Sequence, residues 1–306
     1  MTKIAIVGAG AVGSTAAYAL LLQGIAHEIA LIDVNKQKAE GEALDLEHSM
    51  PYLRHSTLTF GDDYALCTRA DIVVITAGFA QKPGETRLQL VQRNAELFKV
   101  MIPKIAVHAP QSIIVVVTNP VDILTALTLK YSGFPKSLVF GTGTALDTAR
   151  FRYLLGESLH INPKSIHTFI LGEHGDSEFP VLSTANVGGL RLEYVEGYSP
   201  EIAQNAFLHT KNAAYEIISK KGATFYAIGV VISRICKAIL EDQHEVMPLS
   251  TWIDNYYDVC NLCISTPCVI GRDGVERKIQ LPLNEPEVAA LRNSGKILKE
   301  ILDKIV

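Results

Sequence analysis

His174 lies between two glycines in Gly172-Glu173-His174-Gly175, directly after an apolar run. Imidazole exchanges a proton near neutral pH, so a histidine presented by such a loop suits general acid–base catalysis. Asp147 and Arg150 are three residues apart and share one face of a predicted helix. Asp147 can orient and stabilise a protonated His174, and Arg150 can bind a carboxylate through two hydrogen bonds. These residue types predict proton transfer on a bound carboxylic acid.

Each of these residues also has a structural interpretation. A single histidine such as His174 is more often structural than catalytic. Thr144-Ala145-Leu146-Asp147 resembles a capping box, in which the acidic residue closes the first turn of a helix. Arg150 is then a surface or pairing charge, and the segment alone favours this alternative.

Two further polar segments follow predicted strands. The segment 80–87 leaves the strand Ile72–Thr76 at the carboxyl edge of the sheet, where ligands of open α/β sheets bind. Its proline and glycine suggest a lid, with Arg87 polarising a substrate carbonyl, although an ordinary surface loop is the commoner case. Asn119, in Thr118-Asn119-Pro120, either donates to a substrate oxygen or makes a turn before a helix.

The segment Gly8-Ala9-Gly10-Ala11-Val12-Gly13 follows a strand and opens a helix. Gly8 permits the tight turn, Gly10 lets the main chain approach a pyrophosphate, and Gly13 allows close helix–strand packing. The helix N-terminus, where Val12 lies, offers free N–H groups to the phosphates. Asp33 ends the second strand. There its carboxylate can accept hydrogen bonds from the ribose hydroxyls, and it would repel the 2′-phosphate of NADP. The sequence therefore predicts an NAD site; the alternative is a glycine turn with a solvated aspartate.

Apolar runs and helical patterns alternate along the first half of the chain. The predicted strands are Ile4–Val7, Ile29–Ile32, Ile72–Thr76, Ile113–Val117 and Leu138–Phe140, and the predicted helices are Ala11–Leu22, Lys36–His48 and Leu88–His108. Strands that are apolar on both faces are typical of a covered parallel sheet. The pattern predicts an α/β fold with a doubly wound, mostly parallel Rossmann sheet and right-handed crossovers.

The pattern changes beyond residue 142. The predicted elements there are helices over Leu146–Leu159, Pro200–Leu240 (with a break near Gly222) and Pro286–Ile305, an extended segment over Ser165–Leu171, and a hairpin over Cys260–Arg277. We predict an NAD-binding domain over residues 1–142 and an α+β substrate domain over residues 143–306.

Composition excludes several classes of protein. The net charge is −4 without a basic run, which argues against nucleic-acid binding. No uncharged apolar stretch reaches about 18 residues, and the N-terminus lacks a signal-peptide pattern. Five cysteines, an odd number, favour reduced thiols and a cytoplasmic protein. Cys260, Cys263 and Cys268 are spaced like metal ligands, but their apolar surroundings without a nearby histidine favour a strand, so no metal is predicted.

Together these segments resemble the L-lactate/L-malate dehydrogenase family, nearly from end to end. The similarity is carried by Gly8-Ala9-Gly10, residues 77–87, Val117-Thr118-Asn119-Pro120, Leu146-Asp147-Thr148-Ala149-Arg150 and Gly172-Glu173-His174-Gly175-Asp176. The resemblance implies that His174 is the general acid/base with Asp147 as its partner, and that Arg150 binds the substrate carboxylate. It also implies that Arg87 is the lid arginine and that Asn119 contacts both NAD and substrate.

The resemblance further implies the lactate branch of this family and reduction of pyruvate to L-lactate. Thr224 matches a substrate-pocket threonine of that branch. Gln81 stands where a malate enzyme is expected to carry an arginine for the second carboxylate of oxaloacetate. The alternatives are a malate or broader 2-hydroxyacid dehydrogenase, and, in another class, an NAD-binding or structural protein without turnover.

The start of the chain at the first strand, without an N-terminal arm, resembles the bacterial members. Bacterial relatives often bind fructose bisphosphate between subunits through an arginine and a histidine. Arg152 and His167 fall on those positions, although both residues can equally face a subunit contact. The family also suggests a homotetramer.

Gln81→Arg is expected to shift the substrate preference from pyruvate toward oxaloacetate. An uncharged Gln81 leaves the second carboxylate of oxaloacetate without a partner in a dry site, and the arginine supplies one. The measurement is the ratio of kcat/KM for pyruvate to kcat/KM for oxaloacetate. An unchanged ratio would refute the role given to Gln81.

Overall fold

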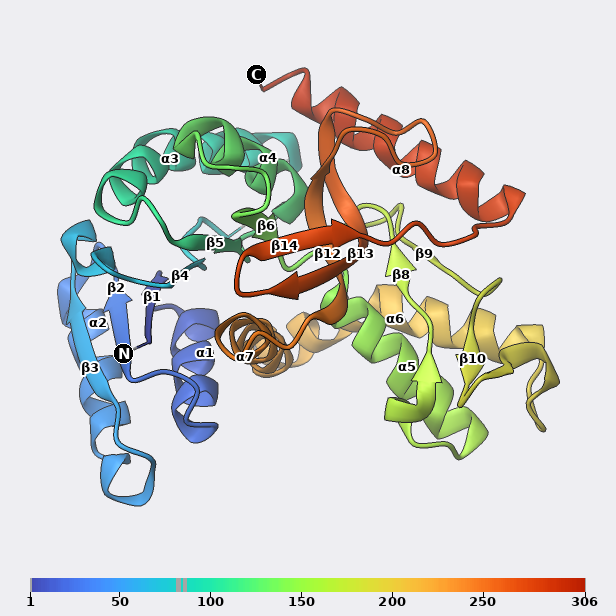
Figure 1. Cartoon of the computed structure of the whole chain (residues 1–306), viewed down its shortest axis with the longest axis horizontal. Helices are drawn as coiled ribbons and strands as arrows, with labels where there is room; N and C mark the ends of the chain where they lie inside the picture. Colours follow the sequence, from blue (N-terminus) through green and yellow to red (C-terminus); the bar gives the residue numbers. More distant parts are fainter. Residues whose placement is uncertain (1, 81–83, 85–86, 306) are drawn as a thin grey trace.

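One mixed sheet runs through the molecule (Figure 1). The structure, a computed structural model, describes residues 2–80, 84 and 87–305. Within this part of the chain the sheet has nine strands in the order β14-β13-β12-β6-β5-β4-β1-β2-β3. In chain order they are β1 (Lys3–Val7), β2 (Glu28–Ile32), β3 (Thr57–Gly61), β4 (Ile72–Ile75), β5 (Ile113–Val116), β6 (Val139–Gly141), β12 (Glu245–Ile253), β13 (Leu262–Gly271) and β14 (Gly274–Lys278).

The strands β1 to β6 are parallel and doubly wound. Their helices are α1 (Ala11–Leu22), α2 (Lys36–Glu47), α3 (Arg87–His108) and α4 (Val121–Ser132). The predicted Rossmann sheet is confirmed, and α1 has the predicted bounds. The strand β3 was not predicted, because its sequence TLTFG alternates threonine with apolar residues and lacks the continuous apolar run of the other strands.

The second half of the chain extends the same sheet. β12, β13 and β14 are antiparallel, and β12 joins β6 where Ser250 pairs with Gly141. The predicted hairpin is confirmed as β13 and β14, whereas β12, which contains Pro248, was not predicted. The division into domains at residue 142 stays a prediction, because the sheet continues across it.

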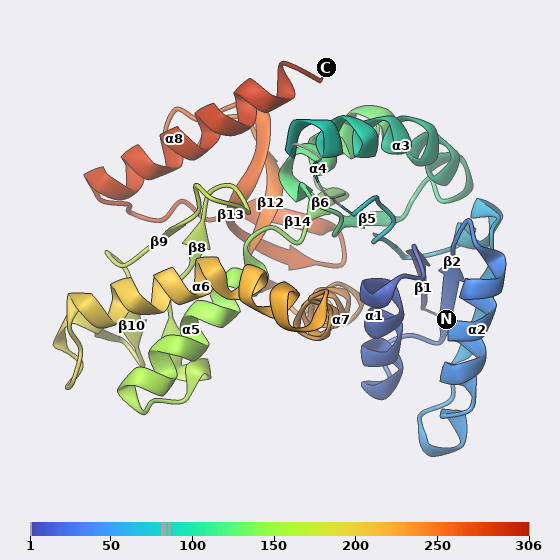
Figure 2. The ribbon, with the colours of Figure 1, turned by 180° about the vertical axis from the view of Figure 1, so that it is seen from behind.

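The second half also contains helices and short strands outside this sheet. The helices are α5 (Ala145–Leu159), α6 (Pro200–Lys221), α7 (Tyr226–Leu240) and α8 (Glu285–Leu302), and the short strands are β7 (Ile166–His167), β8 (Ile170–Leu171), β9 (Phe179–Pro180), β10 (Asn186–Val187) and β11 (Leu190–Arg191). Single 3-10 turns are η1 (Met50–Tyr52), η2 (Tyr64–Cys67), η3 (Pro163–Ser165) and η4 (Leu192–Tyr194). The predicted break near Gly222 is confirmed, and both views show α7 beside α1 (Figures 1 and 2).

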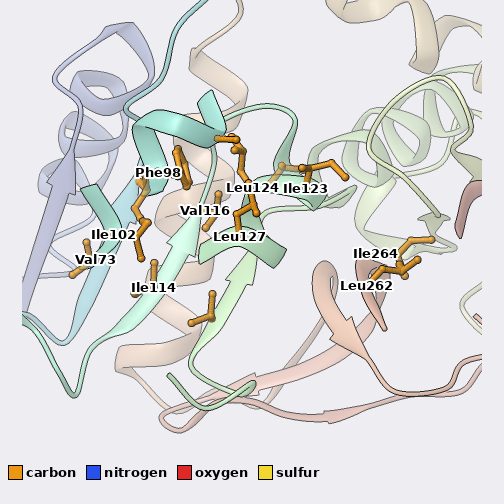
Figure 3. Packing of buried hydrophobic residues seen from close by; sticks show 14 of the residues in the cluster. Val73, Phe98, Ile102, Ile114, Val116, Ile123, Leu124, Leu127, Leu262 and Ile264 are labelled. Carbon is orange, nitrogen blue, oxygen red and sulfur yellow. The ribbon is translucent and has the colours of Figure 1, made fainter. Parts of the chain in front are cut away.

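Buried apolar side chains cover both faces of the sheet. On one face, Phe98 and Ile102 of α3 and Leu124 of α4 pack with strand residues Ile114 and Val116 (Figure 3). These side chains are fully buried, so each stabilises the fold by about 2 kcal/mol through removal of apolar surface from water. This packing fixes the carboxyl ends of the strands, from which the functional segments leave.

The cysteine-rich segment belongs to the sheet. Cys263 and Cys268 are buried on β13, five residues apart, and therefore point to opposite faces of the strand. Cys260 is exposed before β13. This arrangement agrees with the strand interpretation.

None of the described helices has the length and hydropathy needed to span a membrane.

Candidate active site

A cavity of about 330 Å³ opens at the carboxyl ends of β1, β2 and β4. Its lining includes three of the predicted cofactor residues, Gly8, Gly10 and Asp33. Sequence reasoning did not single out Lys38 and Tyr64, which also line it. These two residues follow β2 and β3. The tendency of open α/β sheets to bind ligands at the carboxyl ends of their strands could have pointed to them.

The glycine turn has the geometry that the motif requires. Gly8 has a φ of +108°, and a Cβ atom at Gly13 would lie 1.9 Å from the main-chain oxygen of Gly8. A Cβ atom at Gly10 would meet nothing within 4 Å, so the space beside this residue is open. Gly10 caps α1 without a side-chain hydrogen bond, and Val12 is the second helical residue. The free N–H groups of this helix end face an open space that fits a pyrophosphate.

Asp33 is held in place by the main chain. Its Oδ2 accepts from the N–H of Ala9 at 2.8 Å, and its Oδ1 accepts from the N–H of Asn35 at 2.9 Å. Each oxygen keeps a further lone pair, which is what two ribose hydroxyls require. The residues present therefore fit NAD.

A second cavity, of about 430 Å³, contains the predicted chemistry. Asn119, Asp147, Arg150 and His174 all line it, although they come from three separate segments of the chain. Glu178 lines it as well, and the sequence analysis had not singled this residue out.

Asp147 contacts both His174 and Arg150 in this cavity. Its Oδ2 lies 2.7 Å from Nδ1 of His174, and its Oδ1 accepts from Arg150 at 3.0 Å. The capping-box interpretation of this segment is wrong. The hydroxyl of Thr144 caps no N–H group and instead donates to the main-chain oxygen of Ile170 at 2.6 Å.

This pairing sets the proton affinities of the site. Burial of Asp147 raises its pKa, but His174 and Arg150 outweigh burial and hold the pKa below its ordinary value. For His174, burial lowers the pKa, whereas the attraction and hydrogen bond of Asp147 raise it to about 9. His174 therefore carries a proton at neutral pH and can act as a general acid.

Three elements hold the main chain of the His174 loop. Gly172 exchanges hydrogen bonds with Ser265 of β13, and the N–H of Glu173 donates to the hydroxyl of Ser294 of α8 at 2.6 Å. The N–H of His174 itself donates to Oδ2 of Asp122 on α4 at 2.8 Å. Consecutive residues of the loop are thus fixed from different directions.

Asp122 anchors the His174 loop, and the sequence analysis did not single this residue out. It is buried, and its Oδ1 accepts from the hydroxyl of Ser250 at 2.5 Å. Burial raises its pKa to about 6, even though Ser250 and His174 donate to it. The available signal was an acidic residue in the first turn of a strongly apolar helix.

Several predicted residues lie outside this cluster. Gln81 lies outside the described residues. Arg87 is the first residue of α3, but the structure does not describe its side chain. Thr224 is half-buried between α6 and α7 and is absent from the lining of the 430 Å³ cavity as described.

The two predicted effector residues, Arg152 and His167, also lie away from this cavity. Arg152 donates through Nε and Nη2 to the main-chain oxygen of Thr168, at 2.9 and 2.7 Å. His167 is exposed on β7.

Known proteins resemble this chain over its full length. The family described as lactate/malate dehydrogenase, NAD binding domain, matches residues 2–141, and the alpha/beta C-terminal domain of that family matches residues 144–306. An L-lactate dehydrogenase of Clostridium botulinum (strain Loch Maree / Type A3) is 45% identical over 311 aligned positions, covering 99% of this chain and 96% of that enzyme. An L-lactate dehydrogenase of Acetivibrio thermocellus is 46% identical over 305 positions, covering 98% and 96%.

Solved structures agree with these relatives. A lactate dehydrogenase from a Medee basin deep-sea metagenome library has a TM-score of 0.96 at 42% identity, covering 99% of this chain and 98% of that one. The minor L-lactate dehydrogenase of Enterococcus mundtii, in a ligands-bound form, also has a TM-score of 0.96 at 42% identity, covering 100% and 98%.

Alanine substitutions at Gly10 and Gly13 should separate cofactor binding from stability. Gly10→Ala adds a methyl group where no protein atom lies within 4 Å, so the thermal midpoint should stay unchanged while the Kd for NADH rises about tenfold. Gly13→Ala meets the oxygen of Gly8 and should cost about 3 kcal/mol of unfolding free energy. Fluorescence titration with NADH and thermal denaturation measure the two effects. Normal NADH binding by folded Gly10→Ala would contradict the assignment of the glycine turn.

Asp122→Ala should lower both stability and turnover. The substitution leaves the N–H of His174 and the buried hydroxyl of Ser250 without their acceptor, at a cost of about 3 kcal/mol. With the loop less fixed, kcat should fall about tenfold or more while the KM changes less. Asp122→Asn is the matched control, because its amide oxygen keeps an acceptor for His174. A wild-type kcat in Asp122→Ala would show that this contact does not position the histidine.

Proposed function

The chain belongs to the lactate/malate dehydrogenase family, and we propose that it acts as an NAD-dependent L-lactate dehydrogenase. The reaction is the reversible reduction of pyruvate to L-lactate. The observation that carries this proposal is the convergence of His174, Asp147 and Arg150 on one cavity. A proton donor and a carboxylate-binding cation in one cavity are what a 2-keto acid reductase requires.

Each residue of the site has a distinct task in this scheme. Arg150 binds the carboxylate of pyruvate through its planar guanidinium. His174 gives its proton to the carbonyl oxygen, and Asp147 orients the ring and stabilises the imidazolium until transfer. Asn119 holds the substrate against the cofactor. Bound NADH supplies the hydride that reaches the keto carbon.

The raised pKa of His174 suits the reduction of pyruvate, which consumes a proton. Because the pKa of His174 is raised to about 9, the imidazole is protonated below that pH and loses its proton as the pH rises through it. Pyruvate reduction should therefore decline on the alkaline side, whereas lactate oxidation needs the neutral ring and should gain there.

The proposal extends to the remaining predicted residues. Gln81 and Arg87 belong to a lid that excludes water, with Gln81 selecting the methyl group of pyruvate over a second carboxylate. Thr224 completes the substrate pocket. Of the motif residues, Gly8, Gly10, Val12, Gly13 and Asp33 bind NAD.

Regulation, assembly and location are further parts of the proposal. We assign Arg152 and His167 to fructose bisphosphate, because both are charged or titratable and lie outside the substrate cavity. Exposed apolar side chains on α1 and α7, such as Leu22 and Val230, support self-association. The proposed assembly is a homotetramer, which sedimentation velocity tests. The five free cysteines support a reducing, cytoplasmic setting.

The experiment follows the loss of NADH absorbance with pyruvate and with oxaloacetate, each with and without fructose bisphosphate. A large preference for pyruvate supports the proposed substrate, and a preference for oxaloacetate would move the enzyme to the malate branch. No turnover with either substrate would leave a cofactor-binding protein. A pyruvate saturation curve that ignores fructose bisphosphate would rule out the effector role of Arg152 and His167.

Arg150→Gln should lower kcat/KM for pyruvate by about a thousandfold, because the substrate carboxylate then lies unpaired in a closed site. Arg150→Lys is the control that keeps the charge but not the planar fork, so its loss should be smaller. Steady-state kinetics with NADH measure both variants. Near-normal kcat/KM in a folded Arg150→Gln protein would remove Arg150 from the scheme.

A further inference from the structure

Glu178 is a buried carboxylic acid that the reaction scheme does not use. It follows His174 by four residues, lines the same cavity of about 430 Å³, and is only 7% exposed. A glutamate is rarely buried so deeply unless it is paired. The protonation state of Glu178 therefore depends on the charged groups around it.

Two carboxyl groups face one imidazole in this cavity. An oxygen of Glu178, an oxygen of Asp147 and a ring nitrogen of His174 lie within 4.8 Å of one another. The direct hydrogen bond of 2.7 Å belongs to Asp147, so Glu178 is a second acidic group near the ring at longer range. Coulombic attraction acts at such distances, and burial strengthens it.

The charged groups packed around this pair come from every adjoining element. They are Asp147 and Arg150 on α5, Asp122 on α4, Lys211 on α6, and Glu173 and Asp176 in the same loop. The ammonium group of Lys211 donates a hydrogen bond to the main-chain oxygen of Asp176 at 2.8 Å. Its charge lowers the pKa of Glu178, but burial and Asp147 outweigh this effect.

Glu178 and His174 change charge over neighbouring pH ranges. Burial, followed by repulsion from Asp147, raises the pKa of Glu178 to about 8, although His174, Lys211 and Arg150 oppose this rise. The carboxyl group is mostly neutral at pH 7 and ionises just before His174 loses its proton. Two groups this close titrate as a coupled pair.

We propose that Glu178 is a positioning residue of the acid–base site, whose ionised carboxylate strengthens the hold of His174 on its proton. The inference rests on the proposed function, in which His174 is the acid. As Glu178 ionises, the added negative charge favours the imidazolium, so the form that reduces a keto acid persists to higher pH. Glu178 acts through His174 and needs no contact with substrate.

The test follows the titration of His174 by NMR of its Cε1–H group in the protein without substrate, assigned with the His174→Asn variant. The wild-type curve should have two steps, because His174 reports the ionisation of Glu178 as well as its own. Glu178→Gln keeps the size of the side chain but cannot ionise. It should give a single step, and His174 should lose its proton more readily, with an acid dissociation constant about tenfold larger than in the wild type.

Two further variants serve as controls. Glu178→Asp keeps an ionisable group farther from the ring, so two steps should remain with a smaller separation. Glu216→Gln removes the charge of an exposed glutamate on α6 and should leave the His174 curve unchanged. If both Glu178 variants give the wild-type curve, the inference is overturned; if Glu178→Gln does not fold, the Glu178→Asp curve decides alone.

Turnover is measured separately, as NADH oxidation with pyruvate against pH. In Glu178→Gln the alkaline limb of kcat should move to lower pH, which a merely structural role would not cause. Absence of turnover in the wild type, together with the two-step titration, would defeat the proposed function but not the coupling. Normal turnover with identical titrations in wild type and Glu178→Gln would defeat this inference alone.

Discussion

The arrangement of the substrate cavity depends on the pairing of the buried Asp147 carboxylate with His174 and Arg150. One oxygen faces the imidazole of His174 and the other faces the guanidinium of Arg150. An unpaired charge at this depth would cost several kcal/mol, so the carboxylate and the two cationic side chains stabilise one another. The same contact links α5 to the catalytic loop, and any shift between the two would break it.

The surrounding fold keeps that contact in register. β13, α8 and α4 hold consecutive main-chain groups of the loop through Ser265, Ser294 and Asp122. These elements are far apart in the sequence, and α4 belongs to the nucleotide-binding half. The central sheet therefore contributes to catalysis indirectly, by bringing three anchors to one loop.

The sequence predicts the first half of the fold well because its signals are local. Apolar runs, helical spacing and the glycine motif each occupy a few consecutive residues, and α1 was predicted with its bounds. The strands β3 and β12 and the helix α4 were missed. β3 alternates threonine with apolar residues and has no continuous apolar run, and Pro248 interrupts the pattern of β12.

The residues of the candidate site were also predicted only in part. A resemblance over the whole chain was needed to raise His174 and Arg150 above their structural alternatives, and the geometry then removed the capping-box interpretation of Asp147. Asp122 and Glu178 escaped prediction since an isolated acidic residue has no pattern. Their roles follow from burial and from neighbours that only the tertiary structure brings close.

The passage of the chain from the first half to the second has a mechanical consequence. Gly141 pairs with Ser250, the N–H of Thr142 donates to Val116, and that of Thr144 donates to the hydroxyl of Ser265. Rotation of one half against the other would have to break the contacts to Ser250 and Ser265 together, so the sheet resists hinge motion at this point. The continuous sheet therefore helps to keep the cofactor site and the acid at a constant separation.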